Sequence, residues 1–240
     1  MDLRQLRTTR TFASFCILVL FCAPGPAQEP EPAAVIRSVD ASVAARFESV
    51  LGFTDVEHYA VYRGDDQVHP AAEMTVRDTY KKGVGKIYTV LSQSGSSIFL
   101  HFGLKPLLGN EQTINQSGNV EKSWFNSANY EMKLNSAAVQ KLNGRDCFAL
   151  DIKPKQLAPN LIIGTMWVDA QDGTLVQIDG IASKNPSAFS GTTHMMRQYT
   201  NINGYSMAIH ARAESDSALF GRTVVTIDYS NYNLEIKSGK

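Results

Sequence analysis

The stretch MRQYTNINGYSMAIHA (residues 196–211) predicts the fold most directly, because it places two β-rich runs around an Asn-Gly pair. Asn203-Gly204 is typical of a two-residue type I′ turn, in which both residues take positive φ angles. Such a turn fixes the register of the hairpin that it closes. One face is then expected to carry the pairs Ile202 with Tyr205, Thr200 with Met207, Gln198 with Ile209 and Met196 with Ala211. The other face is expected to carry Met195, Arg197, Tyr199, Ser206, His210, Arg212 and Glu214.

Two further turns outside this stretch predict the same kind of hairpin. Asn143-Gly144 is a second type I′ signal, and it groups Val139, Phe148 and Leu150 on one face with Cys147 on the other. The loop at residues 170–173 ends in a glycine suited to a left-handed position. Its register predicts one face made of Ile163, Thr165, Trp167, Val176 and Ile178. The last strand, at residues 222–230, alternates with Val225, Ile227 and Tyr229 on one side.

The first half of the chain adds two helical elements. Hydrophobic periodicity predicts an amphipathic helix at residues 33–51 and short strands at residues 54–63, 73–81 and 86–92. A second helical stretch at residues 97–108 carries Phe99, Phe102 and Leu108, and Gly103 and Pro106 are expected to break or kink it.

These elements define the fold class. We count about ten strands, all compatible with one antiparallel sheet, and a sheet of that size tends to curl. The prediction is a mainly β (α+β) fold: a single large curved antiparallel sheet forming an unclosed half-barrel, with helices covering the concave face. The apolar face could be packed core or an open cavity of several hundred Å³.

The first 27 residues predict a secretory signal peptide. Arg4, Arg7 and Arg10 precede an apolar run at residues 12–23, which is shorter than the roughly 20 residues that cross a bilayer. Cleavage before Gln28 leaves residues 28–240 as a single domain. The leader also removes Cys16 and Cys22, so that the mature chain retains Cys147 alone and forms no internal disulfide.

Composition and motifs exclude several function classes. Lys plus Arg and Asp plus Glu number 23 each, so no basic excess indicates a nucleic-acid partner. The five histidines lack ligand spacing, and the turn around Asp169 and Asp172 does not match a calcium loop. No G-x-S-x-G, P-loop, H-E-x-x-H or C-x-x-C motif is present. We therefore expect no metal, no cofactor and no enzyme activity, with Cys147 as a small buried filler.

Several phrases carry a family resemblance. NGRDCFAL (residues 143–150), MWVD (residues 166–169) with Asp172-Gly173, and the strand between Phe220-Gly221-Arg222 and Asp228-Tyr229 follow the leader, helix and meander in a familiar order. Together they resemble the LolA-like group of bacterial outer-membrane lipoprotein-sorting proteins, and in particular its uncharacterised members. The resemblance covers essentially the whole mature chain.

The resemblance implies a periplasmic carrier that holds acyl chains of lipoproteins or lipids in a hydrophobic cavity between the half-barrel and a helical lid, for which residues 98–108 are the candidate. Its partners would be those acyl chains and the envelope membrane proteins that load and unload them, and the chain would be a monomer. The cavity residues are then Phe99, Phe102, Leu108, Phe148, Leu150, Ile163, Trp167, Val176, Ile178, Met196, Met207, Ile209, Val225, Ile227 and Tyr229.

Two alternatives remain at this point. The first is a non-enzymatic module that senses lipids or lipoproteins and acts through a protein partner. The second is an enzyme that uses Cys147 or the scattered carboxylates, and it requires polar groups to converge in a cleft. The predicted register opposes the second alternative, because it places Cys147 opposite the apolar face.

Overall fold

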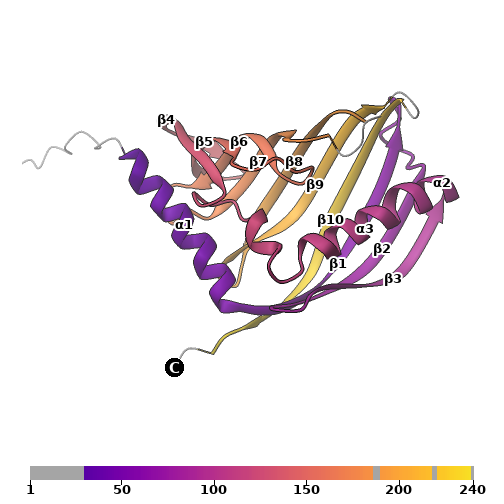
Figure 1. Cartoon of the computed structure of the whole chain (residues 1–240), viewed down its shortest axis with the longest axis horizontal. Helices are drawn as coiled ribbons and strands as arrows, with labels where there is room; N and C mark the ends of the chain where they lie inside the picture. Colours follow the sequence, from indigo (N-terminus) through magenta and orange to yellow (C-terminus); the bar gives the residue numbers. More distant parts are fainter. Residues whose placement is uncertain (1–29, 186–189, 218–220, 239–240) are drawn as a thin grey trace, which may run out of the picture.

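The molecule is built on one antiparallel sheet of ten strands that does not close into a barrel (Figure 1). The computed structural model describes residues 30–185, 190–217 and 221–238, so the predicted signal peptide lies outside the described residues. The strands are β1 (Val50–Arg63), β2 (Ala72–Lys81), β3 (Gly85–Gly95), β4 (Tyr130–Leu142), β5 (Arg145–Pro154), β6 (Ile162–Asp169), β7 (Leu175–Ala182), β8 (Ser190–Ile202), β9 (Tyr205–Ser217) and β10 (Gly221–Ile236). The helical elements are α1 (Pro32–Ser49), α2 (Ser97–Phe99), η1 (Leu100–Leu104), α3 (Lys105–Ile114) and η2 (Val120–Ser123).

The strand order explains why helices lie on the concave face. The order is β3-β2-β1-β10-β9-β8-β7-β6-β5-β4, so that β1 and β10 pair as the third and fourth strands and β3 and β4 form the two edges. Because β4 follows β3 in the chain, residues 96–129 have to run from one edge to the other. This connection crosses the concave face, and α1 covers the end of the sheet near β4 (Figure 1). The predicted half-barrel with helices on its concave face is confirmed.

Residues 97–114 form a helix in three parts, which we call the crossing helix. The predicted break lies in η1, where the backbone N–H of Lys105 donates to the carbonyl of Leu100, five residues earlier, instead of four. The next residue is Pro106, which has no N–H to donate. The helix continues beyond this wide turn to Ile114, further than the sequence predicts.

The crossing helix rests on the sheet through one row of leucines. Leu100, Leu104 and Leu108 recur every fourth residue, and all three are buried. Phe102 points away from this row and is 80% exposed. The prediction that Phe102 faces the interior is therefore wrong, because the leucine row determines which side of the helix is buried.

The predicted turns are confirmed by their backbone angles. Asn143 and Asn203 have φ of 51° and 53°, and each precedes a glycine of positive φ. Gly173 has φ of 69° at the end of its loop. These three turns close the β4–β5, β8–β9 and β6–β7 hairpins.

In the β8–β9 hairpin, the predicted register holds near the turn and fails beyond it. The two pairs nearest Asn203-Gly204 form as predicted. Beside Tyr199, β9 contains one extra residue, Ile209. The resulting shift places Arg197, and not Met196, opposite Ala211. Since an extra residue on one strand reverses every side chain after it, the predicted facing of Met196 and Arg197 is wrong. Met195 packs against the buried apolar residues in place of Met196.

The β6–β7 hairpin contains the same kind of irregularity. Val176 is an extra, buried residue on β7, so that Ile178 lies opposite Met166 and not opposite Thr165. Met166 is fully buried. Ile163 and Trp167 therefore lie on the convex face, and their predicted place on the apolar face is wrong. The Trp167 Nε1 donates there to Gln140 Oε1 at 3.2 Å.

The β4–β5 hairpin follows the prediction on β5 only. Phe148 and Leu150 are buried in the core as predicted. Val139 is 50% exposed, because the pairing of β4 is irregular between Leu134 and Gln140. Cys147 is buried, in agreement with its predicted role as a filler.

Three apolar clusters fill the concave side. The α1 cluster packs α1 on β4–β8 and contains Val35, Val39, Tyr130, Phe148, Leu150, Ile152, Leu161, Ile162, Met166, Val168 and Ile178. The crossing cluster packs the crossing helix on β1, β2, β9 and β10 and contains Tyr59, Val61, Ala72, Met74, Val76, Leu100, Leu104, Leu108, Ala211 and Ile227. A third cluster joins Val50, Phe53, Tyr80 and Met207.

Candidate functional site

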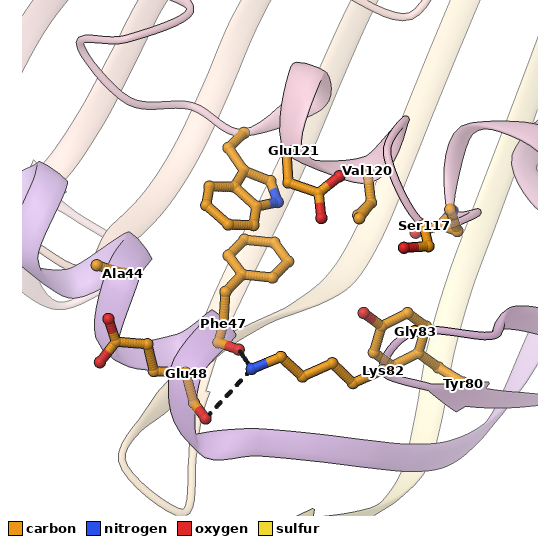
Figure 2. A pocket seen from close by; sticks show the side chains of 11 residues that line it. Ala44, Phe47, Glu48, Tyr80, Lys82, Gly83, Ser117, Val120 and Glu121 are labelled. Carbon is orange, nitrogen blue, oxygen red and sulfur yellow. Dashed lines mark hydrogen bonds between the residues drawn. The ribbon is translucent and has the colours of Figure 1, made fainter.

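A cleft of about 160 Å³ opens between the end of α1, the β2–β3 turn and η2 (Figure 2). Its walls are largely aromatic: the rings of Phe47 and Trp124 stack with centroids 4.1 Å apart, and Tyr80 lines the opposite side. Glu48, Glu121 and Lys82 also line the cleft. It is smaller than the several hundred Å³ predicted from the sequence, and below the roughly 300 Å³ at which ligand pockets begin.

Lys82 fixes one wall of this cleft. Its Nζ donates to the carbonyl oxygens of Phe47 at 2.6 Å and Glu48 at 3.5 Å, as Figure 2 shows. These carbonyls lie in the last turn of α1, where no intrahelical donor remains for them. A cation is favoured at this end of a helix, so Lys82 holds the end of α1 against the β2–β3 turn.

The strands β8–β10 run between the two helical coverings (Figure 1), and they carry a strip of apolar side chains that are only partly buried. Met195 and Tyr199 are only partly buried against the α1 cluster, and Val225 and Tyr229 only partly against the crossing cluster. The concave face therefore presents more apolar surface than the helices cover.

A buried charged group lies under the crossing helix. Asp55 and Glu57 on β1 and Asp78 on β2 are at most 1% exposed, and their carboxylate oxygens lie within 4.8 Å of one another. We call these three residues the acidic cluster. The Lys86 Nζ lies 2.8 Å from Glu57 Oε1 and 3.0 Å from Asp78 Oδ2. It also lies 3.8 Å from Glu111 Oε2 on the crossing helix, whose carboxylate accepts a hydrogen bond from the Tyr88 hydroxyl at 2.8 Å.

Asp55 is the least compensated member of the acidic cluster. Neither of its oxygens has a hydrogen-bond partner among the described residues. Its neighbour Tyr232 donates its hydroxyl proton to the carbonyl of Ala208 at 2.8 Å. Asp55 also lies directly opposite Asp78 across the β1–β2 ladder, and facing like charges destabilise a sheet. Burial raises the pKa of Asp55 to about 8, although Lys86 opposes the rise.

The other two carboxylates are also perturbed. Burial is the main cause that raises the pKa of Glu57 and that of Asp78, and Lys86 again opposes it. The Tyr59 hydroxyl donates to the second oxygen of Glu57. Both oxygens of Glu57 are thus engaged, whereas Asp78 contacts Lys86 through one oxygen.

Two arginines are partly buried on the concave side. Arg46 on α1 and Arg197 on β8 lie among tyrosines, with Tyr199 close to both. The Arg46 Nε has no hydrogen-bond partner among the described residues. Burial lowers the pKa of Arg46, whereas the pKa of Arg197 is raised: burial opposes the rise, and Tyr199, Tyr229 and Glu111 outweigh it.

Nine of the fifteen residues predicted to line a cavity lie in or against the three apolar clusters. Six are buried there: Leu108, Phe148, Leu150, Ile178, Met207 and Ile227. Three are partly buried: Phe99, Val225 and Tyr229. The extra residues Val176 and Ile209 belong to none of these clusters. The remaining four lie elsewhere, Phe102 on the outside of the crossing helix and Ile163, Trp167 and Met196 on the other face of the sheet.

The sequence analysis missed the charged interior, although β1 carries a signal for it. Asp55 and Glu57 occupy alternate positions with Phe53 and Tyr59, which places them on the apolar face of an alternating strand. Polar groups therefore converge in the interior, but not around Cys147. Burial, reinforced by Asp169, raises the pKa of the Cys147 thiol, which keeps it protonated and weakly reactive.

No helix among the described residues is both long and apolar enough to span a bilayer.

No protein-family model matches the chain, and no curated protein matches it.

Solved structures do show likeness to this chain. A LolA superfamily protein from Nitrosomonas europaea is 12% identical, with a TM-score of 0.45 over 86% of this chain and 94% of its own. A DUF1329 family protein from Desulfovibrio piger is 15% identical, with a TM-score of 0.41 over 85% of this chain and 95% of its own. An outer membrane lipoprotein-sorting protein domain from Vibrio parahaemolyticus is 12% identical, with a TM-score of 0.48 over 87% of this chain and 94% of its own.

Proposed function

We propose that this protein is a non-enzymatic carrier of the periplasm that binds acyl chains of lipoproteins or lipids against the concave face of its sheet. The observation that supports the proposal best is the partly covered apolar strip over β8–β10. Each methylene group removed from water contributes about 0.8 kcal/mol, so an acyl chain laid along this strip binds without covalent chemistry.

The crossing helix is the part that moves in this proposal, because the cleft beside it is too small for an acyl chain. Three leucines and Glu111 hold this helix on the sheet. Its wide turn at Leu100–Leu104 interrupts the regular hydrogen bonding and provides a bending point. Displacing the helix would join the strip to the apolar surface beneath Leu104.

The first test is to purify residues 28–240 from a bacterial periplasm and to record a native mass spectrum. We expect an acylated species at near-stoichiometric amount, released by solvent extraction. A protein that carries no such species and takes up no fluorescent fatty acid would contradict the proposal. A protein that binds the fatty acid but never passes it to acceptor vesicles would favour the lipid-sensing alternative.

A matched pair of variants tests the location. Val225→Glu places a charge on the concave strip, and Ile181→Glu places one at another β-branched residue, on β7. Ile181 pairs with Ile163, on the face opposite the α1 cluster. We expect Val225→Glu to lose most fatty-acid binding and Ile181→Glu to retain it. Equal binding by the two variants would exclude the strip as the site.

A further inference from the structure

We propose that the acidic cluster of Asp55, Glu57 and Asp78 is a binding site for one divalent cation of the calcium type, located beneath the crossing helix. No motif in the sequence marks it, since the three ligands come from two strands that lie side by side. The proposal rests on charge, on the separation of the oxygens, and on the unpartnered carboxylate of Asp55. It is independent of the cargo proposed above.

Carboxyl groups outnumber cations around the cluster. The acidic cluster and Glu111 bring four carboxyl groups, and Lys86 is the one cationic side chain within 4 Å of the cluster among the described residues. Buried charges in proteins are paired or coordinate metals, and a buried carboxyl group without such a partner keeps its proton. A divalent cation would bind in exchange for that proton on Asp55, and it would supply the positive charge that Lys86 does not bring to this side chain.

The positions of the oxygens fit such an ion. The three carboxylates each offer an oxygen within 4.8 Å of the others. Calcium lies about 2.3–2.6 Å from its oxygen ligands, so two ligands on opposite sides of the ion are about 4.6–5.2 Å apart. An ion between Asp55 and Asp78 would therefore fit without a large rearrangement of the strands. It would contact Glu57 as well once Lys86 releases the oxygen that it now holds.

Asp55 is the decisive ligand. It is 1% exposed, and neither of its oxygens has a hydrogen-bond partner among the described residues. No ion pair joins it to Lys86, which is engaged with Glu57 and Asp78. The cation would lie between Asp55 and the free oxygen of Asp78, away from the Lys86 ammonium. All ligands are hard oxygen donors, the type that calcium prefers over nitrogen or sulfur.

Access to this site leads past Lys86 and Glu111. These side chains are 10% and 15% exposed, whereas those of Glu57 and Asp78 are fully buried. Glu111 belongs to the crossing helix, so the cation would enter at the edge of that helix. A bound ion would also release Lys86 to strengthen its contact with Glu111, which is 3.8 Å away.

The test uses the purified mature chain after removal of metals with EDTA and then of the EDTA itself. Calcium is titrated by calorimetry, and terbium serves as a luminescent probe excited through Tyr59 and Tyr88. We expect saturable uptake of one ion per chain, and a melting temperature that rises with calcium concentration. Absence of saturable uptake by the folded chain would overturn the proposal.

Variants assign the uptake to the cluster. Asp55→Asn keeps the shape of the side chain and removes one charge, so calcium binding should weaken by more than about tenfold. Asp216→Asn, at an exposed carboxylate of β9, is the matched control and should bind like the unmodified chain. If Asp55→Asn fails to fold, Asp78→Asn takes its place. Unchanged affinity in a folded variant of the cluster would show that the ion binds elsewhere, and would also overturn the proposal.

Discussion

The two coverings of the concave face, α1 and the crossing helix, rest on different kinds of surface. The α1 cluster is apolar, and it extends from Val35 on the helix to Met166 on β6. The crossing helix also packs a row of leucines, but the sheet beyond them carries the acidic cluster and Lys86. A similar helix-on-sheet arrangement thus encloses an apolar core beneath α1 and buried charged groups beneath the crossing helix.

The two coverings also differ in how they are attached. The carboxylate of Asp40 on α1 accepts hydrogen bonds from the N–H and the hydroxyl of Ser127, at 2.7 and 2.6 Å. The Ser42 hydroxyl donates to the carbonyl of Gly173 at 2.9 Å. The crossing helix is joined to the sheet through Glu111, which contacts Tyr88 and Lys86, and through Phe99, whose ring lies 5.4 Å from the Arg63 guanidinium. The wide turn at Leu100–Leu104 has no counterpart in α1, and for this reason our proposal assigns the movement to the crossing helix.

The largest effect is expected from removing the positive charge of Lys86 beneath the crossing helix. Lys86→Met leaves the carboxylates of Glu57 and Asp78 buried without their cation, which should lower the free energy of unfolding by about 3–5 kcal/mol at neutral pH. Urea denaturation measures the change. Lys141→Met is the control, because Lys141 and Asp146 form an exposed pair whose loss should cost less than about 1 kcal/mol. Similar losses of unfolding free energy in both variants would show that the charged groups beneath the crossing helix are no more important for stability than an exposed ion pair.

A smaller effect is expected at the attachment of α1. In Gly173→Ala, the added Cβ would lie 2.5 Å from Ser38 Oγ and 2.6 Å from the Ser38 carbonyl carbon, and the residue would have to keep its φ of 69°. We expect a loss of about 1–3 kcal/mol and faster hydrogen exchange in α1. Gly144→Ala has the same kind of φ and no atom within 4 Å, so it measures the backbone strain alone. Equal losses in the two variants would show that contact with α1 contributes nothing.

The smallest effect is expected at the β6–β7 turn, which α1 contacts. Partial burial raises the pKa of Asp169, but the N–H of Gln171 and the Arg145 guanidinium outweigh it and hold the pKa below its usual value. A lowered pKa stabilises the fold above the unfolded value of about 3.9, and this contribution is lost as pH falls through the folded value.

Asp169→Asn should therefore lower stability by about 1–2 kcal/mol at pH 7. The difference from the unmodified chain should shrink below about pH 4 and vanish once the pH lies well below the folded-state pKa. Chemical denaturation at several pH values measures this profile. A difference that stays constant with pH would indicate lost packing and not a lost charge.

The sequence predicted the framework of the sheet because its turns are local. The Asn-Gly pairs require positive φ at two adjacent positions, and few other residues tolerate this. The predictions that failed concern which face of the sheet the side chains occupy beyond a bulge. Val176 and Ile209 are ordinary β-branched residues with no local feature that marks them as extra, so the consequences for Trp167 and Met196 became visible only in the folded sheet.

The candidate site was predicted in its apolar part and missed in its polar part. Ile227 and Tyr229 were placed correctly, because β10 alternates regularly along this stretch. Asp55 and Asp78 are separated in the chain, and only the register of β1 on β2 brings them face to face. A period-two pattern shows that an aspartate points inward, but it does not show which charge it meets there.

The pairing of β1 with β10 has a consequence for how the molecule forms. Every other neighbouring pair of strands is consecutive in the chain, whereas residues 64–220 separate β1 from β10. Closing so long a loop costs more entropy than closing a hairpin, and distant contacts slow folding. We therefore expect the β1–β3 and β4–β10 meanders to form first and to join last along the seam between β1 and β10. A chain still being synthesised would then have both edges of its sheet before this seam can close.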